Sequence, residues 1–346
     1  MSRILVCGVQ TPYVSGGAEI LVETLAQQLR TRGHQVDVIA LPYTDAPRTQ
    51  VVLGFMAWRI LNLQLIHEKP VDLVIGTKFP SYAVNHRNKV VWLTHQHRQA
   101  YELYGTKYSD MHTRPDGMLF ARIVRGLDGW SLGEAKALFS ISQNTANRLK
   151  RYNGLDARPL YPPPRLAPLL HCERYDDYLL AIGRFEPIKR FDLILRALAL
   201  TKCGVRCVLV GDGMQRAELE QLTDQLGVRD RVQFAGNVDD ATLADLYANC
   251  LGVVYPPFDE DYGYVTVEAL LSKKPVISTT DSGGVLEFLR EGEDGFIAEP
   301  TPESLAEAIE RLWSARSRVA DLGEAGYQRV KGITWEPVID GLTSTL

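Results

Sequence analysis

The strongest constraint on the fold is a pattern that the chain contains twice: an apolar strand, a turn with glycine, and an amphipathic helix. The first copy starts with RILVCGV at residues 3–9, and its helix is expected over residues 18–32. The second copy starts with YDDYLLAIG at residues 175–183 and continues into another amphipathic helix. Apolar strands that alternate with helices are typical of parallel sheets covered by helices. The sequence therefore predicts an α/β fold with a Rossmann-like unit in each half.

A proline-rich stretch separates the two copies. RPLYPPPRLAP, at residues 158–168, cannot form a helix because proline lacks an amide hydrogen and has a fixed φ. We therefore expect an N-terminal domain over residues 1–160 and a C-terminal domain over residues 170–330. Residues 331–346 are expected to form one more short helix, around Trp335. A length of 346 residues suits two domains of this kind.

Composition and charge argue against several classes of protein. The formal net charge of −4 gives no general attraction to nucleic acid, and no run approaches the roughly 18 apolar residues that span a bilayer. The five cysteines form no CxxC pair, so a reducing cytoplasm is the expected setting. Two basic stretches, at residues 86–89 and 148–151, could contact the inner face of a membrane as a peripheral partner. Solvated ends of helices and strands are the favoured interpretation of these stretches.

Residues 256–295 contain the main candidate for a ligand site. Glu260 lies in an acidic loop after a predicted strand, and Glu268 lies about one turn into a helix expected over residues 265–272. Both carboxylates would face one crevice at the carboxyl end of the strand, where open α/β sheets bind ligands. Carboxylates only accept hydrogen bonds, so this pair suits a ligand rich in hydroxyl groups. A solvated acidic loop beside an ordinary helix glutamate is the alternative.

Two glycine turns in the same stretch could hold phosphate. Gly263 precedes a helix that begins near Tyr264 and Val265, while Gly283 and Gly284 are expected to open a further helix. Backbone amides at the start of a helix bind phosphate groups. Phosphate-binding amides beside acceptors for hydroxyl groups predict a sugar nucleotide as the ligand.

The same stretch resembles a known family. Glu260 and Glu268 in an E-x7-E spacing, followed by KPVIST, GG-x-x-E and DGFI, are similar to the retaining glycosyltransferases of family 4. Other motifs match too: P-x-x-x-GG-x-E at 12–19, RGH at 32–34, G-R-x-x-x-x-K at 183–189 and GDG at 211–213. The resemblance implies the GT-B fold, in which two Rossmann-like domains face each other across a cleft. It also implies that the last helix crosses back onto the first domain.

The resemblance implies a role for each matched charged residue. Arg184 and Lys189 would bind the donor diphosphate. Glu260 would contact the sugar hydroxyls and support oxocarbenium charge, whereas Glu268 would accept hydrogen bonds from the ribose. One departure is Arg190, where many members have glycine; its charge could alter donor contacts or face solvent.

The remaining site residues are implied in the same way. His95 would orient the sugar from the first domain, with His97 as the second choice; no set of metal ligands lies near this H-x-H pair, so a metal site is not favoured there. Glycine permits the positive φ that lets consecutive amides converge on an anion. The backbone residues expected to approach the donor are Gly16, Gly17, Gly183, Gly211, Asn237 and Val238.

The predicted function is that of a retaining hexosyltransferase using a nucleotide-diphosphate sugar. The acceptor could be a glycan, a lipid-linked glycan or a small molecule, and the aromatic tract at residues 99–114 is expected to bind it. No cofactor and no obligatory metal are expected. A sugar-nucleotide epimerase or hydrolase of the same fold, and a catalytically silent partner subunit, are the alternatives. A dehydrogenase is not favoured, because neither half has G-x-G-x-x-G.

Overall fold

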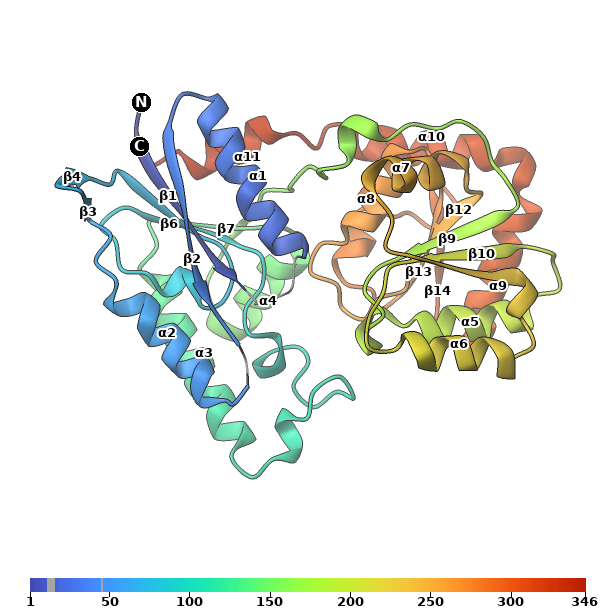
Figure 1. The fold of residues 1–346 in the computed structure, drawn as a ribbon, viewed down its shortest axis with the longest axis horizontal. Coiled ribbons are helices and arrows are strands. Elements are labelled where there is room, and N and C mark those ends of the chain that lie inside the picture. The colour runs from blue at the N-terminus through green and yellow to red at the C-terminus, as the bar shows by residue number, and fades with distance from the viewer. Residues whose placement is uncertain (11–15, 45) are drawn as a thin grey trace. The chain divides into compact units, whose positions relative to one another are not determined.

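Two sheets of parallel strands, one in each half of the chain, form the framework of the computed structural model (Figure 1). The structure describes residues 1–10, 16–44 and 46–346, without the side chain of Ala18. The chain divides into two units: Met1–Pro163 with Thr334–Leu346 form unit 1, and Pro164–Ile333 form unit 2.

The sheet of unit 1 has the strand order β2-β1-β5-β6-β7-β8. Its strands are β1 (Arg3–Gln10), β2 (Gln35–Pro42), β5 (Leu73–Gly76), β6 (Lys89–Leu93), β7 (Ala137–Ser140) and β8 (Arg158–Pro159). A small antiparallel pair, β3 (Leu65–Ile66) and β4 (Lys69–Pro70), lies outside it. The helices are α1 (Gly17–Thr31), α2 (Thr49–Ile60), α3 (Gly117–Gly133), α4 (Gln143–Asn153) and α11 (Trp335–Leu342). Continuous apolar strands such as β6 are buried throughout, as expected for a parallel sheet covered on both faces.

The sheet of unit 2 has the order β11-β10-β9-β12-β13-β14. Its strands are β9 (Tyr178–Ile182), β10 (Arg206–Val210), β11 (Val232–Gly236), β12 (Gly252–Val254), β13 (Val276–Thr279) and β14 (Gly295–Ala298). The helices are α5 (Phe191–Leu200), α6 (Arg216–Gln225), α7 (Asp240–Asn249), α8 (Tyr264–Leu271), α9 (Pro302–Ser314) and α10 (Val319–Val330). Numbered within the unit, the order is 3-2-1-4-5-6, that of a dinucleotide-type Rossmann fold. Its topological switch point lies between β9 and β12.

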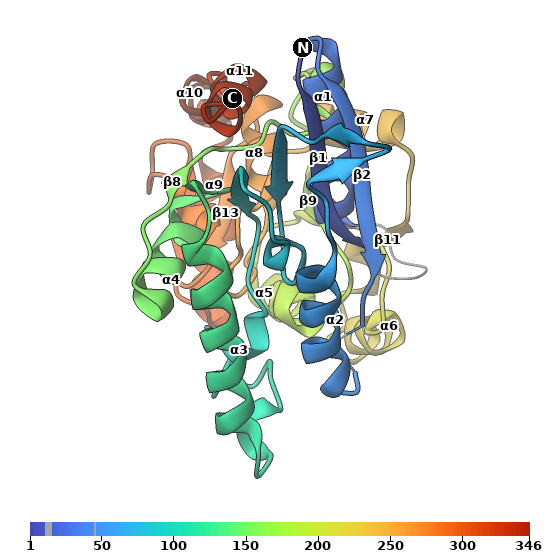
Figure 2. The ribbon, with the colours of Figure 1, turned by 90° about the vertical axis from the view of Figure 1, so that its left-hand side faces the viewer.

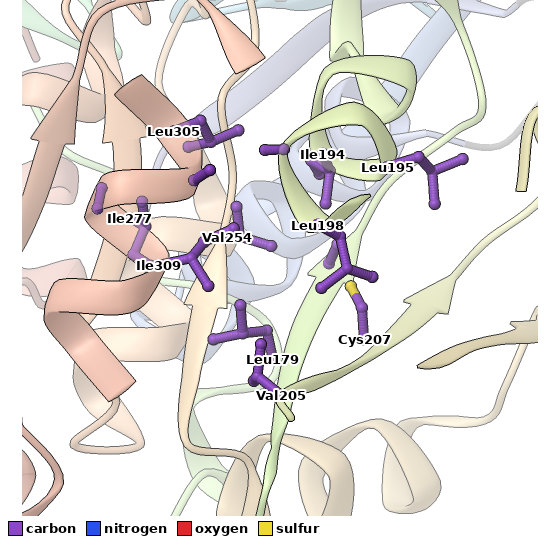
Figure 3. Packing of buried hydrophobic residues seen from close by; sticks show 14 of the residues in the cluster. Leu179, Ile194, Leu195, Leu198, Val205, Cys207, Val254, Ile277, Leu305 and Ile309 are labelled. Atoms are coloured by element: carbon purple, nitrogen blue, oxygen red, sulfur yellow. The ribbon is translucent and has the colours of Figure 1, made fainter. Parts of the chain in front are cut away.

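The core of unit 2 lies between its sheet and the helices α5 and α9. Figure 3 shows the packing of side chains from α5 (Ile194, Leu198), α9 (Leu305, Ile309) and the strands (Leu179, Val254, Ile277). All of these side chains are almost completely buried. The apolar stripe predicted for residues 193–198 therefore holds α5 against the sheet, and this fixes the loop that precedes it.

The last helix belongs to unit 1. The ring of Trp335 lies 6.1 Å from that of Trp92 in β6. Val338, Ile339 and Leu342 of α11 are buried. The apolar side of this short helix thus packs within unit 1, although some 170 residues separate it in sequence from the rest of that unit.

Short elements follow two of the helices. After α2 ends at Ile60, the chain forms an isolated bridge at Asn62 and the β3–β4 pair. After α9 ends at Ser314, the turn η8 (Arg316–Arg318) leads into α10. One predicted element differs from the structure. The helix expected after Gly283 is only a 3₁₀ turn, η7 (Gly284–Glu287).

Each of the two basic stretches contains both buried and exposed side chains. His86, Lys89 and Arg148 are buried, whereas Arg87, Lys150 and Arg151 are exposed. The Lys89 ammonium donates to the Ser131 carbonyl oxygen at 2.7 Å, and Arg148 is paired with Glu102 at 3.1 Å. The buried charges therefore belong to the interior of unit 1, and only the exposed ones are solvated ends of elements as predicted.

Candidate active site

Three side chains meet at the switch point of the sheet in unit 2. Lys189 follows β9, whereas Tyr255 and Glu260 follow β12. The Lys189 ammonium donates to Glu260 Oε2 at 2.5 Å and to the Tyr255 hydroxyl at 3.1 Å. An ammonium and a carboxylate thus lie side by side at the carboxyl edge of the sheet, the edge at which open α/β sheets bind ligands.

Lys189 keeps its charge although it is mostly buried. Burial alone would lower the pKa of Lys189, but the adjacent Glu260 carboxylate and Tyr255 raise it above its usual value. Tyr255 was not recognised in the sequence. Its position directly after an apolar strand and before two prolines was the available signal, because strand ends of a parallel sheet line its ligand edge.

Arg184 lies after the same strand but is far more exposed. About 59% of its side chain is accessible, and its guanidinium pairs with Glu186 at 2.8 Å. This contact is a surface salt bridge, and such pairs contribute little to stability. Exposure also leaves the guanidinium able to turn toward an anion at this edge.

Arg190 differs from both roles suggested for it, since it neither faces solvent nor lies open to a ligand. It is buried and has φ +54°, the left-handed conformation that glycine adopts without strain. Its guanidinium donates to the carbonyl oxygens of Pro256 (2.6 Å) and Pro257 (2.7 Å). It also pairs with both carboxylate oxygens of Asp281 and with Thr279. Arg190 therefore ties together the loops after β9, β12 and β13.

Glycines bring the loops after β9 and β10 into contact. Gly183 and Gly211 have φ +153° and +124°, and a Cβ on Gly211 would lie 2.1 Å from the Gly183 carbonyl oxygen. The Gly183 amide donates to the Val210 carbonyl oxygen, and the Phe185 amide donates to the Asp212 carbonyl oxygen. Only glycine allows this approach, so both predicted glycines shape the floor of the site.

Glu268 lies in α8 with its own tyrosine partner. The Tyr247 hydroxyl donates to Glu268 Oε2 at 2.9 Å. Burial raises the pKa of Glu268 to about 7, while the hydrogen bond from Tyr247 and the charge of Arg165 act in the opposite direction. Glu260 and Glu268 thus have different partners, Lys189 and Tyr247. Tyr247 was also missed in the sequence.

The two glycine turns behave differently. Gly263 has φ +87° and precedes α8, and within the described part of the chain the amides of Tyr264 and Val265 donate to no backbone carbonyl. The amide of Gly284, in contrast, donates to the Glu260 carbonyl oxygen at 2.8 Å. In this conformation the Gly284 amide fixes the Glu260 loop, and its contact with a phosphate stays a prediction. Gly283 has φ +61° and is bridged to Glu260.

Asn237 and Val238 follow β11 at the same edge of the sheet. Asn237 is exposed and Val238 is partly buried. The next residue, Asp239, caps α7 by accepting from the Thr242 amide. Both candidate base-reading residues therefore have a rigid backbone, held by a strand on one side and a capped helix on the other.

The predicted residues of unit 1 lie at the carboxyl edge of its own sheet. Gly16 has φ −133° and Gly17 begins α1, so neither has the positive φ expected for an anion-binding turn. The Gly16 amide donates to Glu19, which pairs with Lys78 at 2.6 Å. Lys78 lies two residues after the end of β5 and was not recognised in the sequence. Pro12, also part of the predicted loop, lies outside the described residues.

The two candidate histidines have different surroundings within unit 1. His95 is partly buried, and its Nδ1 donates to the Gln96 carbonyl oxygen at 2.8 Å. Neutral His95 would therefore carry an acceptor lone pair at Nε2. His97 lies among aromatic rings, 5.4 Å from Phe79 and 6.5 Å from Phe120. His97 has a polar neighbour as well, since its Nδ1 lies 3.5 Å from the Tyr43 hydroxyl. His95 stays the predicted contact of the sugar, with His97 as the second choice.

Among the residues that the structure describes, no group of three or more His, Cys, Asp or Glu side chains is arranged to hold a metal ion. The charges at the edge of unit 2 come from the side chains of Lys189, Arg184, Glu260 and Glu268. Such a set can neutralise an anionic leaving group and accept from several hydroxyl groups at once.

Two family models match the chain. The model described as Glycosyltransferase Family 4 matches residues 15–162, and the model described as Glycosyl transferases group 1 matches residues 173–329. Together they span most of the chain. A glycosyltransferase of Methanocaldococcus jannaschii is 25% identical over 339 residues, which cover 88% of this chain and 86% of that protein. Human alpha-1,3/1,6-mannosyltransferase ALG2 is 29% identical over 243 residues, 62% of this chain and 58% of its own length.

Solved structures agree with this match at the level of the fold. Sucrose-phosphate synthase from Thermosynechococcus elongatus has a TM-score of 0.76 at 21% identity and covers 98% of this chain and 96% of its own. HepE of Anabaena, in complex with UDP and glucose, has a TM-score of 0.71 at 20% identity, with both chains covered completely. The fold of two Rossmann-like halves predicted from the sequence is thus confirmed as GT-B.

Proposed function

Because the chain belongs to glycosyltransferase family 4, we propose that it transfers a hexosyl group from a nucleotide-diphosphate sugar to an acceptor with retention of configuration. The acceptor class is a glycan, a lipid-linked glycan or a small molecule. The observation that carries the proposal is the contact between Lys189 and Glu260 at the switch point of unit 2.

This contact suits the bond that would break. Cleavage of the anomeric bond places negative charge on the diphosphate and positive charge on the sugar ring. An ammonium at one side and a carboxylate at the other complement both charges, and side chains fixed before the reaction need no reorganisation during it. We assign the leaving diphosphate to Lys189 and Arg184, with the amides of Tyr264 and Val265. We assign the sugar hydroxyls to Glu260.

The other assignments follow the neighbouring elements. Glu268 would accept from the ribose hydroxyls, and Asn237 and Val238 would contact the base. His95 would accept from the sugar. Since Lys189 and Arg184 already supply positive charge for the diphosphate, the proposed reaction requires no metal. Since Glu260 is paired with Lys189 rather than placed as a nucleophile, we propose a substitution in which the acceptor enters on the face that the diphosphate leaves.

A nucleotide-diphosphate donor is supported by the complex of HepE with UDP and glucose. The donor is identified by thermal shift against a panel of nucleotide sugars, because a ligand that binds only the folded protein raises its melting temperature. The product from that donor and a panel of acceptors is then analysed by NMR for its anomeric configuration. An inverted product would contradict the retaining mechanism. Free sugar and nucleoside diphosphate formed equally fast with and without acceptors would favour a hydrolase or epimerase.

A further inference from the structure

Helices α2 and α3 of unit 1 expose an unusual set of side chains. An exposed helix face is normally polar. Here the exposed positions carry large apolar groups, with relative accessibilities from 43% for Ile123 to 78% for Ile60. These residues, which we call the apolar face of unit 1, are Leu53, Met56, Ile60, Met118, Leu119, Ile123 and Trp130. They make up seven of the thirteen large hydrophobic side chains that are exposed in the described chain.

The two helices form one continuous surface. Figure 2 shows them next to each other, and side-chain contacts join them. Arg59 of α2 stacks on the ring of Trp130 at 4.1 Å, and Phe55 lies 6.4 Å from the same ring. At the other end, Arg48 pairs with Asp116 at 2.6 Å and lies over the ring of Phe120.

The charge on this surface has one sign. The structure describes every residue of α2 and α3. At the exposed positions of these two helices, Arg122 is the single charged side chain. Three described carboxylates that flank α3 in the sequence are each paired with an arginine: Asp116 with Arg48, Asp110 with Arg114 and Glu134 with Arg59. Lys107, in the loop before α3, is exposed as well. An apolar surface with basic groups and no unpaired carboxylate on its helices complements an anionic lipid surface.

We propose that the apolar face of unit 1 docks on a bilayer that contains anionic lipids. Large aliphatic side chains together with an exposed tryptophan are the groups that enter the interface between headgroups and acyl chains. Basic residues beside them add attraction to anionic headgroups. No helix in the described residues has the length and apolar character needed to cross a bilayer, so the contact would lie along the membrane surface.

The position of this face also suggests what the acceptor is, which rests on the function proposed above. The aromatic tract at residues 99–114, predicted to bind the acceptor, leads through η3 (Met111–Thr113) directly into α3. Arg125 of α3 donates to the Ala100 carbonyl oxygen at 2.6 Å, so tract and helix are joined. A face that holds α3 on a membrane places this tract beside lipid headgroups. The acceptor class is therefore an amphiphile with its polar group at the membrane surface.

The test is co-sedimentation of the full chain with vesicles, without donor or acceptor. The vesicles are phosphatidylcholine alone or with 30% phosphatidylglycerol. We expect binding to the mixed vesicles that weakens with added salt. Leu119→Glu should weaken this binding at least about tenfold, because burial of one leucine side chain supplies that much. Arg122→Gln should weaken it about fivefold on anionic vesicles. Leu200→Glu, at a comparably exposed leucine of unit 2, should bind as the wild type does.

A second measurement starts from the wild-type chain alone. Bromine-labelled lipids should quench the wild-type tryptophan emission. Trp130→Phe, which keeps an aromatic side chain at this position, should remove most of the quenching. Absence of binding to either vesicle, or equal binding by Leu119→Glu and Leu200→Glu, would overturn the proposal. A dimer in sedimentation velocity that Leu119→Glu dissociates would instead assign the face to contact between copies of this chain. Because no turnover is measured, failure of the proposed transferase reaction would leave these results unchanged.

Discussion

At the scale of single residues, the charge of Lys189 depends on partners that a bound donor would also contact. In the free chain its ammonium is held by Glu260 and Tyr255. A diphosphate beside Lys189 would share this ammonium with the carboxylate, so the residue is already in place when the leaving group develops charge.

We therefore expect Lys189→Ala to lower kcat/KM by about a hundredfold or more, as for other preorganised groups that stabilise charge. Initial rates of transfer at several donor concentrations give the value. Lys202→Ala, which removes an exposed lysine elsewhere in unit 2, serves as the control. Transfer by Lys189→Ala at a near-normal rate would rule out the proposed role.

Arg190 positions the same site without being part of the proposed donor contacts. Its guanidinium holds the loops that carry Lys189, Glu260 and Gly284. Arg190→Gly keeps the left-handed backbone without strain but releases these loops, and a hydrogen bond from a charged group contributes about 1.5–3 kcal/mol. We expect a kcat/KM at least about tenfold lower, together with a lower melting temperature. Arg190→Lys should not restore the rate, because lysine lacks the planar fork that reaches several acceptors.

Arg190→Ala separates the two contributions. Arg190→Ala loses the same hydrogen bonds as Arg190→Gly. Unlike the glycine variant, it keeps the backbone strain of a residue with a Cβ at φ +54°. The Arg190→Ala variant should therefore have a lower melting temperature than the Arg190→Gly variant, while the two should have similar kcat/KM. If both variants melted lower yet turned over at the wild-type rate, Arg190 would have a structural role only.

At the scale of elements, the ribose contact proposed for Glu268 in α8 would make donor binding depend on the ionisation of this carboxylate. With a pKa of about 7, this carboxylate gains its charge as pH rises from 6 to 8. Only the ionised form accepts from both ribose hydroxyls, so we expect the Kd of a nucleotide sugar to be about tenfold lower at pH 8 than at pH 6. Calorimetric titration across this range measures the change.

Two variants test the source of this pH dependence. Glu268→Gln should bind weakly with no slope between pH 6 and 8. Tyr247→Phe removes a hydrogen bond that lowers the pKa of Glu268, so its midpoint should move to higher pH. An unchanged affinity in Glu268→Gln would remove Glu268 from the ribose site.

The elements that sequence could predict are those whose apolar period is strong and whose ends carry turn residues. The strands β9 and β12, the helix α5 and the position of Glu268 in α8 all agree with this pattern. The helix predicted after Gly283 is longer than the observed 3₁₀ turn. The Gly284 amide donates to the Glu260 loop, and no local sequence pattern encodes this hydrogen bond. Tyr247, Tyr255 and Lys78 were missed for the same reason: each is defined by a partner about 20 to 70 residues away.

At the scale of the whole molecule, the two halves share a plan because each starts from the same strand, turn and helix. Each sheet has its switch point after its first strand, and each places a lysine there: Lys78 in unit 1 and Lys189 in unit 2. The pairing of strands across the switch point is long-range, so the sequence predicted the fold class and the ligand edges but not these ion pairs.

The segment 334–346 joins the end of the chain to unit 1, and its removal should separate the stabilities of the two units. Val338, Ile339 and Leu342 are buried against unit 1, and each such side chain contributes about 1.5–3 kcal/mol. Their combined loss approaches the whole stability of a typical domain.

We expect a chain ending at Ile333 to show fast hydrogen exchange in β1 and β6, with slow exchange and nucleotide affinity retained in unit 2. Asp340→Ala, at an exposed position of α11, should leave both units as in the wild type. Slow exchange in β6 after truncation would contradict a role of α11 in the stability of unit 1. If nucleotide binding were lost while β6 stayed protected, α11 would serve the donor site instead.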